Sequence, residues 1–99
     1  MNRRFLIQPE AKVDILEAAR SLENMHSGAG CRFLALIQRY VDLIETNPLL
    51  FGLLFEDVRA VTIRKYRYVI IYRVLDDLTE ILAVVHGSRD RSSWESRLS

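Results

Sequence analysis

The sequence predicts an α+β fold in which an N-terminal strand and an αα-hairpin pack on a small antiparallel β-sheet. Apolar residues recur at spacings of three and four through most of the first half of the chain, as on the buried faces of helices. From residue 58 the pattern changes to a period of two with many β-branched residues, which indicates strands. Pro48 stands before that change and ends the helical half. The 99 residues fit a single domain spanning residues 1–99.

The helical half contains a strand and two helices. Residues 4–7 form a short apolar run, which indicates a strand. Pro9 suits the first turn of a helix, and a helix is expected over about residues 10–25. Two glycines within residues 26–30 indicate a turn, and a second helix is expected over about residues 30–46. The short connection makes these two helices an antiparallel hairpin.

The second half predicts a three-stranded antiparallel meander. We expect its strands over residues 58–63, 67–75 and 78–86. A two-residue connection at 76–77 would pair Leu75 with Leu78, Arg73 with Glu80, Ile71 with Leu82 and Val69 with Val84. The opposite face would then carry Tyr68, Ile70, Tyr72, Ile81, Ala83 and Val85. Because both faces are mostly apolar, one must take the helical hairpin, and the other must be covered by the tail, a partner or a ligand.

Two further segments have no clean period. Residues 49–55 read LLFGLLF, for which we favour a buried loop or helical turn over a surface patch for a partner. Residues 92–95 match a capping box, so a last short helical turn is expected, with Trp94 as its anchor on the domain.

Composition excludes several classes of protein. Fourteen basic residues face 13 acidic ones, a balance that argues against a protein whose main task is to coat nucleic acid. One cysteine and two histidines give neither a disulfide nor a credible metal site, and no cofactor is expected. No apolar run is long enough for a membrane span or a signal peptide, so we expect a cytoplasmic protein with no membrane partner.

The basic residues are unevenly distributed. Residues 59–73 contain five of them and no acid. Twelve of the 14 basic residues are arginine, which suits bidentate recognition of carboxylate or phosphate. A solvated strand edge and turn is the alternative, but we favour a binding role with an acidic partner segment or phosphate for Arg59, Arg64, Lys65 and Arg67.

Two strand motifs carry a resemblance to a known family. The first is Tyr68-Val69-Ile70-Ile71-Tyr72, and the second runs from Ile81 through His86-Gly87-Ser88-Arg89. Together with the order of elements, they resemble the RelE/ParE toxins of type II toxin–antitoxin systems, over nearly the whole chain. The resemblance is closer to the ParE-like branch. It implies a toxin of the plasmid-stabilization type whose partner is a cognate antitoxin. The toxin would form either a hetero-oligomer with this antitoxin or a homodimer.

Members of this family act by one of two mechanisms, and the resemblance implies that this chain uses one of the two. ParE-like members inhibit DNA gyrase through a binding surface, without catalytic groups. RelE-like members are ribosome-dependent mRNA endoribonucleases, for which Arg89, His86, Arg67 and Lys65 would be the catalytic set here. We favour gyrase, because Val69 replaces the family's strand arginine and no Tyr or His follows Arg89. A non-toxic family member acting only as a protein-binding module is the third alternative.

The residues expected to contact the target or the antitoxin come from the strands and the tail. They are Arg59, Arg64, Tyr68, Tyr72, Arg89 and Trp94. For the two tyrosines, packing in the core with the hydroxyl at its rim is favoured over stacking on a base.

Overall fold

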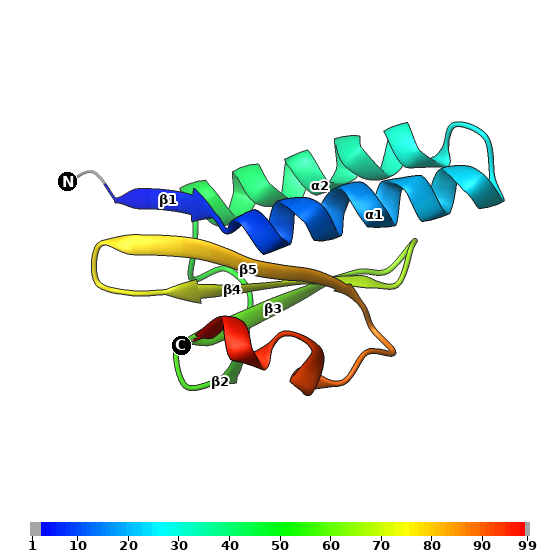
Figure 1. Ribbon diagram of the computed structural model, residues 1–99. Coiled ribbons are helices and arrows are strands. Elements are labelled where there is room, and N and C mark those ends of the chain that lie inside the picture. The colour runs from blue at the N-terminus through cyan, green and yellow to red at the C-terminus, as the bar shows by residue number, and fades with distance from the viewer. Residues whose placement is uncertain (1–2, 99) are drawn as a thin grey trace.

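The computed structural model describes residues 3–98 and has two helices on one face of a five-stranded sheet (Figure 1). The elements in chain order are β1 (Arg4–Ile7), α1 (Pro9–Met25), α2 (Ala29–Thr46), β2 (Leu53–Phe55), β3 (Val58–Ile63), β4 (Tyr68–Val74) and β5 (Leu78–His86). Two short 3-10 turns, Arg91–Ser93 and Glu95–Leu98, follow. The predicted α+β fold with a helical hairpin on the sheet is therefore confirmed.

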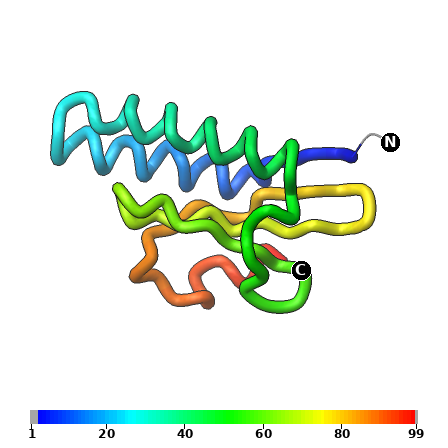
Figure 2. Tube along the Cα trace, turned by 180° about the vertical axis from the view of Figure 1, so that it is seen from behind, coloured from blue at the N-terminus to red at the C-terminus, as the bar shows by residue number. Residues whose placement is uncertain are grey.

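The sheet is wider than the expected meander. Its strand order is β1-β5-β4-β3-β2, with β1 parallel to β5 and the other pairs antiparallel. The N-terminal strand thus becomes one edge of the sheet, next to the last strand. Seen from behind, the helical hairpin lies along one side of the sheet and the C-terminal segment along the other (Figure 2).

The main core lies between the helices and the sheet. Phe33 and Ile44 of α2 are fully buried against Ile70, Tyr72 and Ile81 of the sheet. Burying each side chain of this size stabilises the fold by about 1.5–3 kcal/mol. The phenol of Tyr72 also donates a hydrogen bond to the Pro48 carbonyl, at 2.7 Å, so the loop after α2 is tied to the centre of the sheet.

The C-terminal turns cover the second apolar face, so the tail is the one of the three expected covers that the structure shows. Trp94 is only 3% exposed and packs in a second cluster with Val58, Ile71, Leu82 and Ala83. The capping box does not form as expected, because the first turn already begins at residue 91. The Ser93 hydroxyl donates to the Asp90 carbonyl at 2.7 Å.

The predicted register holds only near the β4–β5 turn. Arg73 lies opposite Glu80 and forms an ion pair with it at 2.7 Å, and the amide of Leu75 donates to the Leu78 carbonyl. An irregularity between residues 71 and 72 then leaves Leu82 as an extra residue on β5. Beyond it, Ile71 pairs with Ala83, Ile70 with Val84 and Val69 with Val85. The expected pairs Ile71–Leu82 and Val69–Val84 are therefore wrong.

This irregularity also exchanges side chains between the faces. Ala83 and Val85 pack in the cluster under the C-terminal turns, and Val84 packs under the helices. The sequence pattern predicts the reverse, because strict alternation carries no mark of an extra residue.

The expectation of a buried loop at residues 49–55 is wrong. Residues 53–55 form the edge strand β2, and Leu49 and Leu53 are 64% and 60% exposed. Only Phe51 and Phe55 of this run pack against the two clusters. The consecutive Leu53 and Leu54 are both exposed, because β2 is an edge strand with a neighbour on one side only.

A tight turn joins the helices and sets their separation. Gly28 has a φ of +87°, which favours glycine. Gly30 lies where α2 crosses α1, and a Cβ there would meet the Ala19 carbonyl oxygen at 2.7 Å. The Glu23 carboxylate accepts the amide hydrogens of both glycines at 2.9 Å and so caps the start of α2. None of the helices within residues 3–98 is long and apolar enough to cross a membrane.

Candidate functional site

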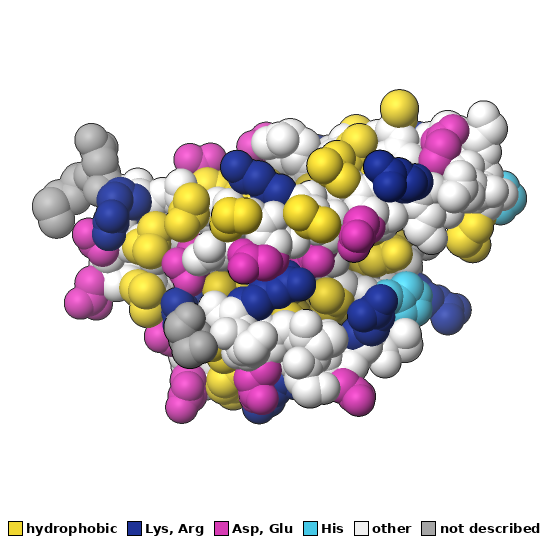
Figure 3. Space-filling view, viewed as in Figure 1, with side chains coloured by type: hydrophobic (Ala, Val, Ile, Leu, Met, Phe, Trp, Pro, Cys, Tyr) yellow, Lys and Arg dark blue, Asp and Glu magenta, His cyan; other side chains and the backbone are white. Residues whose placement is uncertain are grey.

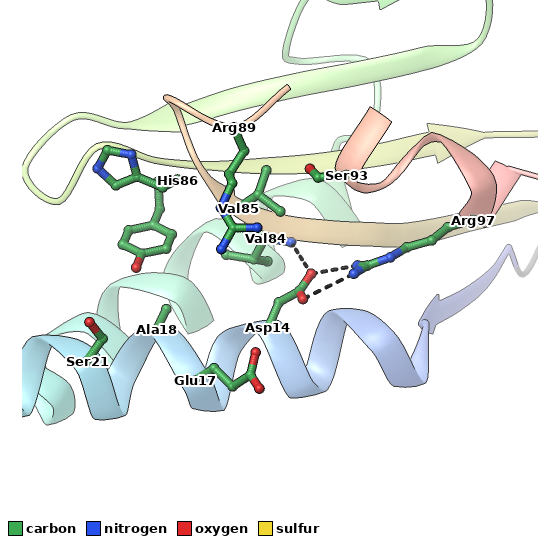
Figure 4. Close-up of a pocket in the computed structure, with 11 residues that line it drawn as sticks. Asp14, Glu17, Ala18, Ser21, Val84, Val85, His86, Arg89, Ser93 and Arg97 are labelled. Atoms are coloured by element: carbon green, nitrogen blue, oxygen red, sulfur yellow. Dashed lines mark hydrogen bonds and ion pairs between the residues drawn. The ribbon is translucent and has the colours of Figure 1, made fainter. Parts of the chain in front are cut away.

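A cleft of about 400 Å³ lies between α1, the end of β5 and the C-terminal turns (Figure 4). Helix α1 contributes Asp14, Glu17, Ala18 and Ser21, and the sheet contributes Tyr68, Val84, Val85 and His86; Arg89, Ser93 and Arg97 close the cleft from the C-terminal segment. The cleft therefore joins the end of the chain to its first helix.

An ion pair forms one end of this cleft. Arg97 donates to both carboxylate oxygens of Asp14, at 2.6 and 3.3 Å, and also to the Leu82 carbonyl at 3.0 Å. The amide of Val84 donates to the same carboxylate at 3.0 Å. The hydrogen bond to Asp14 raises the pKa of the Arg97 guanidinium above its usual range, while partial burial opposes this rise. The positive charge of Arg97 is thus held by Asp14.

His86 and Arg89 lie at the other end of the cleft. The Nδ1 atom of His86 lies 2.8 Å from the Ser88 hydroxyl and accepts the Ser88 amide at 3.2 Å. The His86 ring meets the Tyr68 ring edge-on, with centroids 5.4 Å apart. Arg89 extends towards α1 between His86 and Asp14 (Figure 4).

A second hollow, of about 470 Å³, lies on the other side of Tyr68 and His86. Its floor is largely apolar and includes Leu22, Met25 and Ala29 of the helical hairpin. Lys65 and Arg67 reach it from the β3–β4 turn, where Arg67 has a left-handed φ of +62°. His86 therefore borders both hollows.

The structure brings only some of the sequence-predicted residues together. Lys65 and Arg67 line the second hollow and Arg89 lines the first cleft, while His86 borders both. Arg64 is exposed in the β3–β4 turn. Arg59 lies at the far end of β3, where it donates to the Phe51 carbonyl at 2.7 Å.

Two expected contact residues are core residues instead. Tyr72 has no exposed surface and Trp94 almost none. Burial raises the pKa of the Tyr72 phenol. This burial agrees with the favoured core packing of Tyr72 and with Trp94 as the anchor of the tail, and it leaves neither side chain exposed to a partner. Both are large aromatic side chains that the two sheet faces need for packing. Tyr68 is half-buried, with its ring packed edge-on against Phe33.

Comparison with known proteins places the chain in a family. The sequence model described as "ParE toxin of type II toxin-antitoxin system, parDE" matches residues 5–91. The chain belongs to this ParE toxin family. Toxin ParE2 from two strains of Mycobacterium tuberculosis, CDC 1551 / Oshkosh and ATCC 25618 / H37Rv, is 28% identical over 103 residues, covering 100% of this chain and 95% of the relative.

A solved structure has the same fold. The structure titled "Chromosomal ParDE TA system from P. aeruginosa" aligns with a TM-score of 0.63 at 14% identity. The alignment covers 85% of this chain and 95% of that one. The fold of this ParE-family toxin is therefore that of a chain in a ParDE system.

The two hollows of this ParE-family toxin differ in charge. The first contains two carboxylates, Asp14 and Glu17, beside Arg89 and Arg97, whereas the second is lined by basic, aromatic and apolar side chains without an acid. No group of three or more His, Cys, Asp or Glu side chains within residues 3–98 could hold a metal ion.

Sequence reasoning missed Asp14 and Arg97. They are 83 residues apart, and nothing in their local sequence marks them as partners. In the sequence, Asp14 looks like an ordinary acid on the surface of a helix, and Arg97 looks like one of the charged residues of an exposed tail. Only the packing of the tail on β5 brings them together.

Proposed function

We propose that this ParE-family toxin acts in the cytoplasm by inhibiting DNA gyrase through surface binding, and that a cognate antitoxin neutralises it. The observation that carries this proposal is that the cations a nuclease would use lie in two different hollows, which share only His86 of that set. Arg89 shares its cleft with Asp14 and Glu17, whose negative charges disfavour a phosphodiester there. Lys65 and Arg67 lie in the other hollow. An inhibitor that acts by binding does not require these groups to converge.

Exposed apolar side chains support a protein partner. Val13 and Leu16 on α1 are each more than half exposed, and Leu6 on the neighbouring β1 is 44% exposed. Hydrophobic side chains gather over these elements on the face seen in Figure 3. We assign this surface to the antitoxin, because covering it would remove apolar area from water.

A supercoiling assay tests the proposal. Gyrase, relaxed plasmid and ATP are mixed with the purified toxin, and supercoiled product is followed on gels. We expect supercoiling to fall as toxin is added and to return when the cognate antitoxin is added first. Labelled precursors after induction of the toxin in a bacterial host give the second readout, in which DNA synthesis is expected to fail before protein synthesis. Unchanged supercoiling with toxin in excess over gyrase would refute gyrase inhibition.

One observation favours ribosome-dependent mRNA cleavage as the second candidate. Lys65, Arg67 and His86 do border one hollow, and cations next to a histidine suit attack on a phosphodiester. Ribosomes translating a defined mRNA would then give cuts that are mapped by primer extension. If the toxin cuts this mRNA and Arg67→Ala removes the cuts, the nuclease reading replaces the gyrase reading.

A further inference from the structure

Basic side chains surround Tyr66 on two sides. The second hollow contains Lys65 and Arg67, and a neighbouring hollow of about 270 Å³ contains Lys65 again with Arg32 and Arg39. Both hollows share Lys65 and Tyr66, and neither is lined by an acid. We call these five residues, Arg32, Arg39, Lys65, Tyr66 and Arg67, the Tyr66 surface.

The four cations of the Tyr66 surface take part in none of the ion pairs found among residues 3–98, which involve Arg4, Arg73, Arg91 and Arg97. Glu23 attracts Arg32, but its oxygens accept the amides that start α2. Four cations on one surface, in a chain with a net charge of only +1, indicate an anionic partner.

Helix α2 presents two of these cations on one side. Arg32 and Arg39 are seven residues apart on α2, which is nearly two helical turns, or about 10.5 Å along its axis. Both therefore leave the same side of the helix, and both line the hollow beside Tyr66. An extended polyanion, rather than a single phosphate, can contact cations spread over this length.

The aromatic rings of this region are not arranged as stacking platforms for single strands. The Tyr66 ring packs edge-on against Phe33, with centroids 5.6 Å apart, and the Lys65 ammonium lies 5.6 Å from its centroid. Tyr68 packs against both Phe33 and His86. Single-stranded nucleic acid is held largely by stacking of bases on open aromatic faces. The Tyr66 surface has four cations and a single ring, over which the Lys65 ammonium lies, so it favours duplex backbone instead.

We propose that the Tyr66 surface binds the phosphate backbone of duplex DNA. Binding is independent of base sequence, since only phosphates are contacted. It does not rest on gyrase inhibition, although in that setting it would hold the toxin against the DNA on which gyrase acts. The turn that carries Lys65 and Arg67 lies beneath α2 in Figure 2, so both elements can face one duplex.

Salt dependence of DNA binding tests this assignment. A short fluorescein-labelled duplex of mixed sequence is titrated with the full-length toxin, and anisotropy gives Kd between about 50 and 200 mM salt. Four phosphate contacts predict a slope of log K against log salt of about −3.6. The R32A/R39A variant should lose about two units of that slope, because each phosphate contact contributes roughly one.

A matched variant separates the surface from overall charge. K12A/R20A also removes two cations from exposed helical positions, but on α1 and outside the Tyr66 surface. It should keep the wild-type slope. Alanine favours helix, so both variants are expected to fold, which circular dichroism checks.

Four results would overturn the proposal. The first is no measurable binding to the duplex at about 50 mM salt, and the second is an equal loss of slope in both variants. The third is tighter binding to single-stranded RNA than to the duplex. The fourth is a loss of antitoxin binding in R32A/R39A without a loss of DNA binding.

Supercoiling by gyrase is measured separately. If the toxin binds DNA but leaves gyrase active, only the proposed gyrase inhibition is refuted. If it inhibits gyrase without binding DNA, only the proposed DNA binding is refuted.

Discussion

The cations of the two regions that flank Tyr68 and His86 have different partners. In the cleft with α1, the guanidinium of Arg97 is held by Asp14 and the Leu82 carbonyl, and it joins the tail to the sheet. Around Tyr66, by contrast, four cations take part in no ion pair among residues 3–98. The same residue type therefore stabilises the fold on one side and remains available for a partner on the other. Burial makes this difference, because a desolvated cation needs a partner and an exposed one does not.

The largest effect is expected from breaking the Asp14–Arg97 pair. Arg97→Ala leaves the Asp14 carboxylate, whose side chain is 13% exposed, without its cation. We expect the free energy of unfolding to fall by about 3 kcal/mol, the lower end for a broken buried pair. Urea denaturation measures it. Arg4→Ala is the control, because both side chains of its pair with Asp77 are about 70% exposed, at 3.4 Å, and its cost should stay below about 1 kcal/mol.

An equal effect of the two arginine variants would contradict the comparison. It would mean that the Arg97 pair is no more important than a surface pair. A double variant, D14A/R97A, sharpens the result. It should be more stable than Arg97→Ala alone, because no unpaired carboxylate remains in the cleft.

The second effect concerns the helical hairpin that carries Arg32 and Arg39. Gly30→Ala would place a Cβ 2.7 Å from the Ala19 carbonyl oxygen, so the helices must separate. We expect a loss of about 2 kcal/mol, within the range of overpacking. Gly52→Ala is the matched control, since nothing lies within 4 Å of its new Cβ. Thermal unfolding of both variants decides whether α2 depends on this close contact; similar melting temperatures would refute it.

The sequence predicts those structural features that depend on residues close together in the chain. Pro9, Pro48 and the change of period mark the elements locally, and the strands at 4–7, 58–63 and 78–86 fall where the pattern predicts them. The Arg73–Glu80 pair also follows from a two-residue turn. These features need only neighbours along the chain.

The features that failed depend on the whole fold. The extra residue at Leu82 has no local mark, so the predicted faces of Ala83 and Val85 are reversed. The exposure of Leu53 and Leu54 depends on β2 being an edge strand, which only the assembled sheet determines. Residues 59–73 predict part of the acid-free Tyr66 surface, but its α2 residues Arg32 and Arg39 could be added only from the tertiary structure.

The smallest effect is a pH dependence at the start of α2. The amides of Gly28 and then Gly30 stabilise the Glu23 carboxylate and lower its pKa below the usual 4.5. The folded state therefore releases this proton more readily than the unfolded state, and the resulting stability is fully present above about pH 4.5 and is lost as pH falls through the lowered pKa. Glu23→Gln should flatten this acid limb in urea denaturation series, whereas Glu45→Gln, exposed on α2, should leave it unchanged. If stability falls as steeply with acid in Glu23→Gln as in the wild type, the Glu23 carboxylate does not stabilise the start of α2. The positions of Arg32 and Arg39 on α2 would then not depend on Glu23.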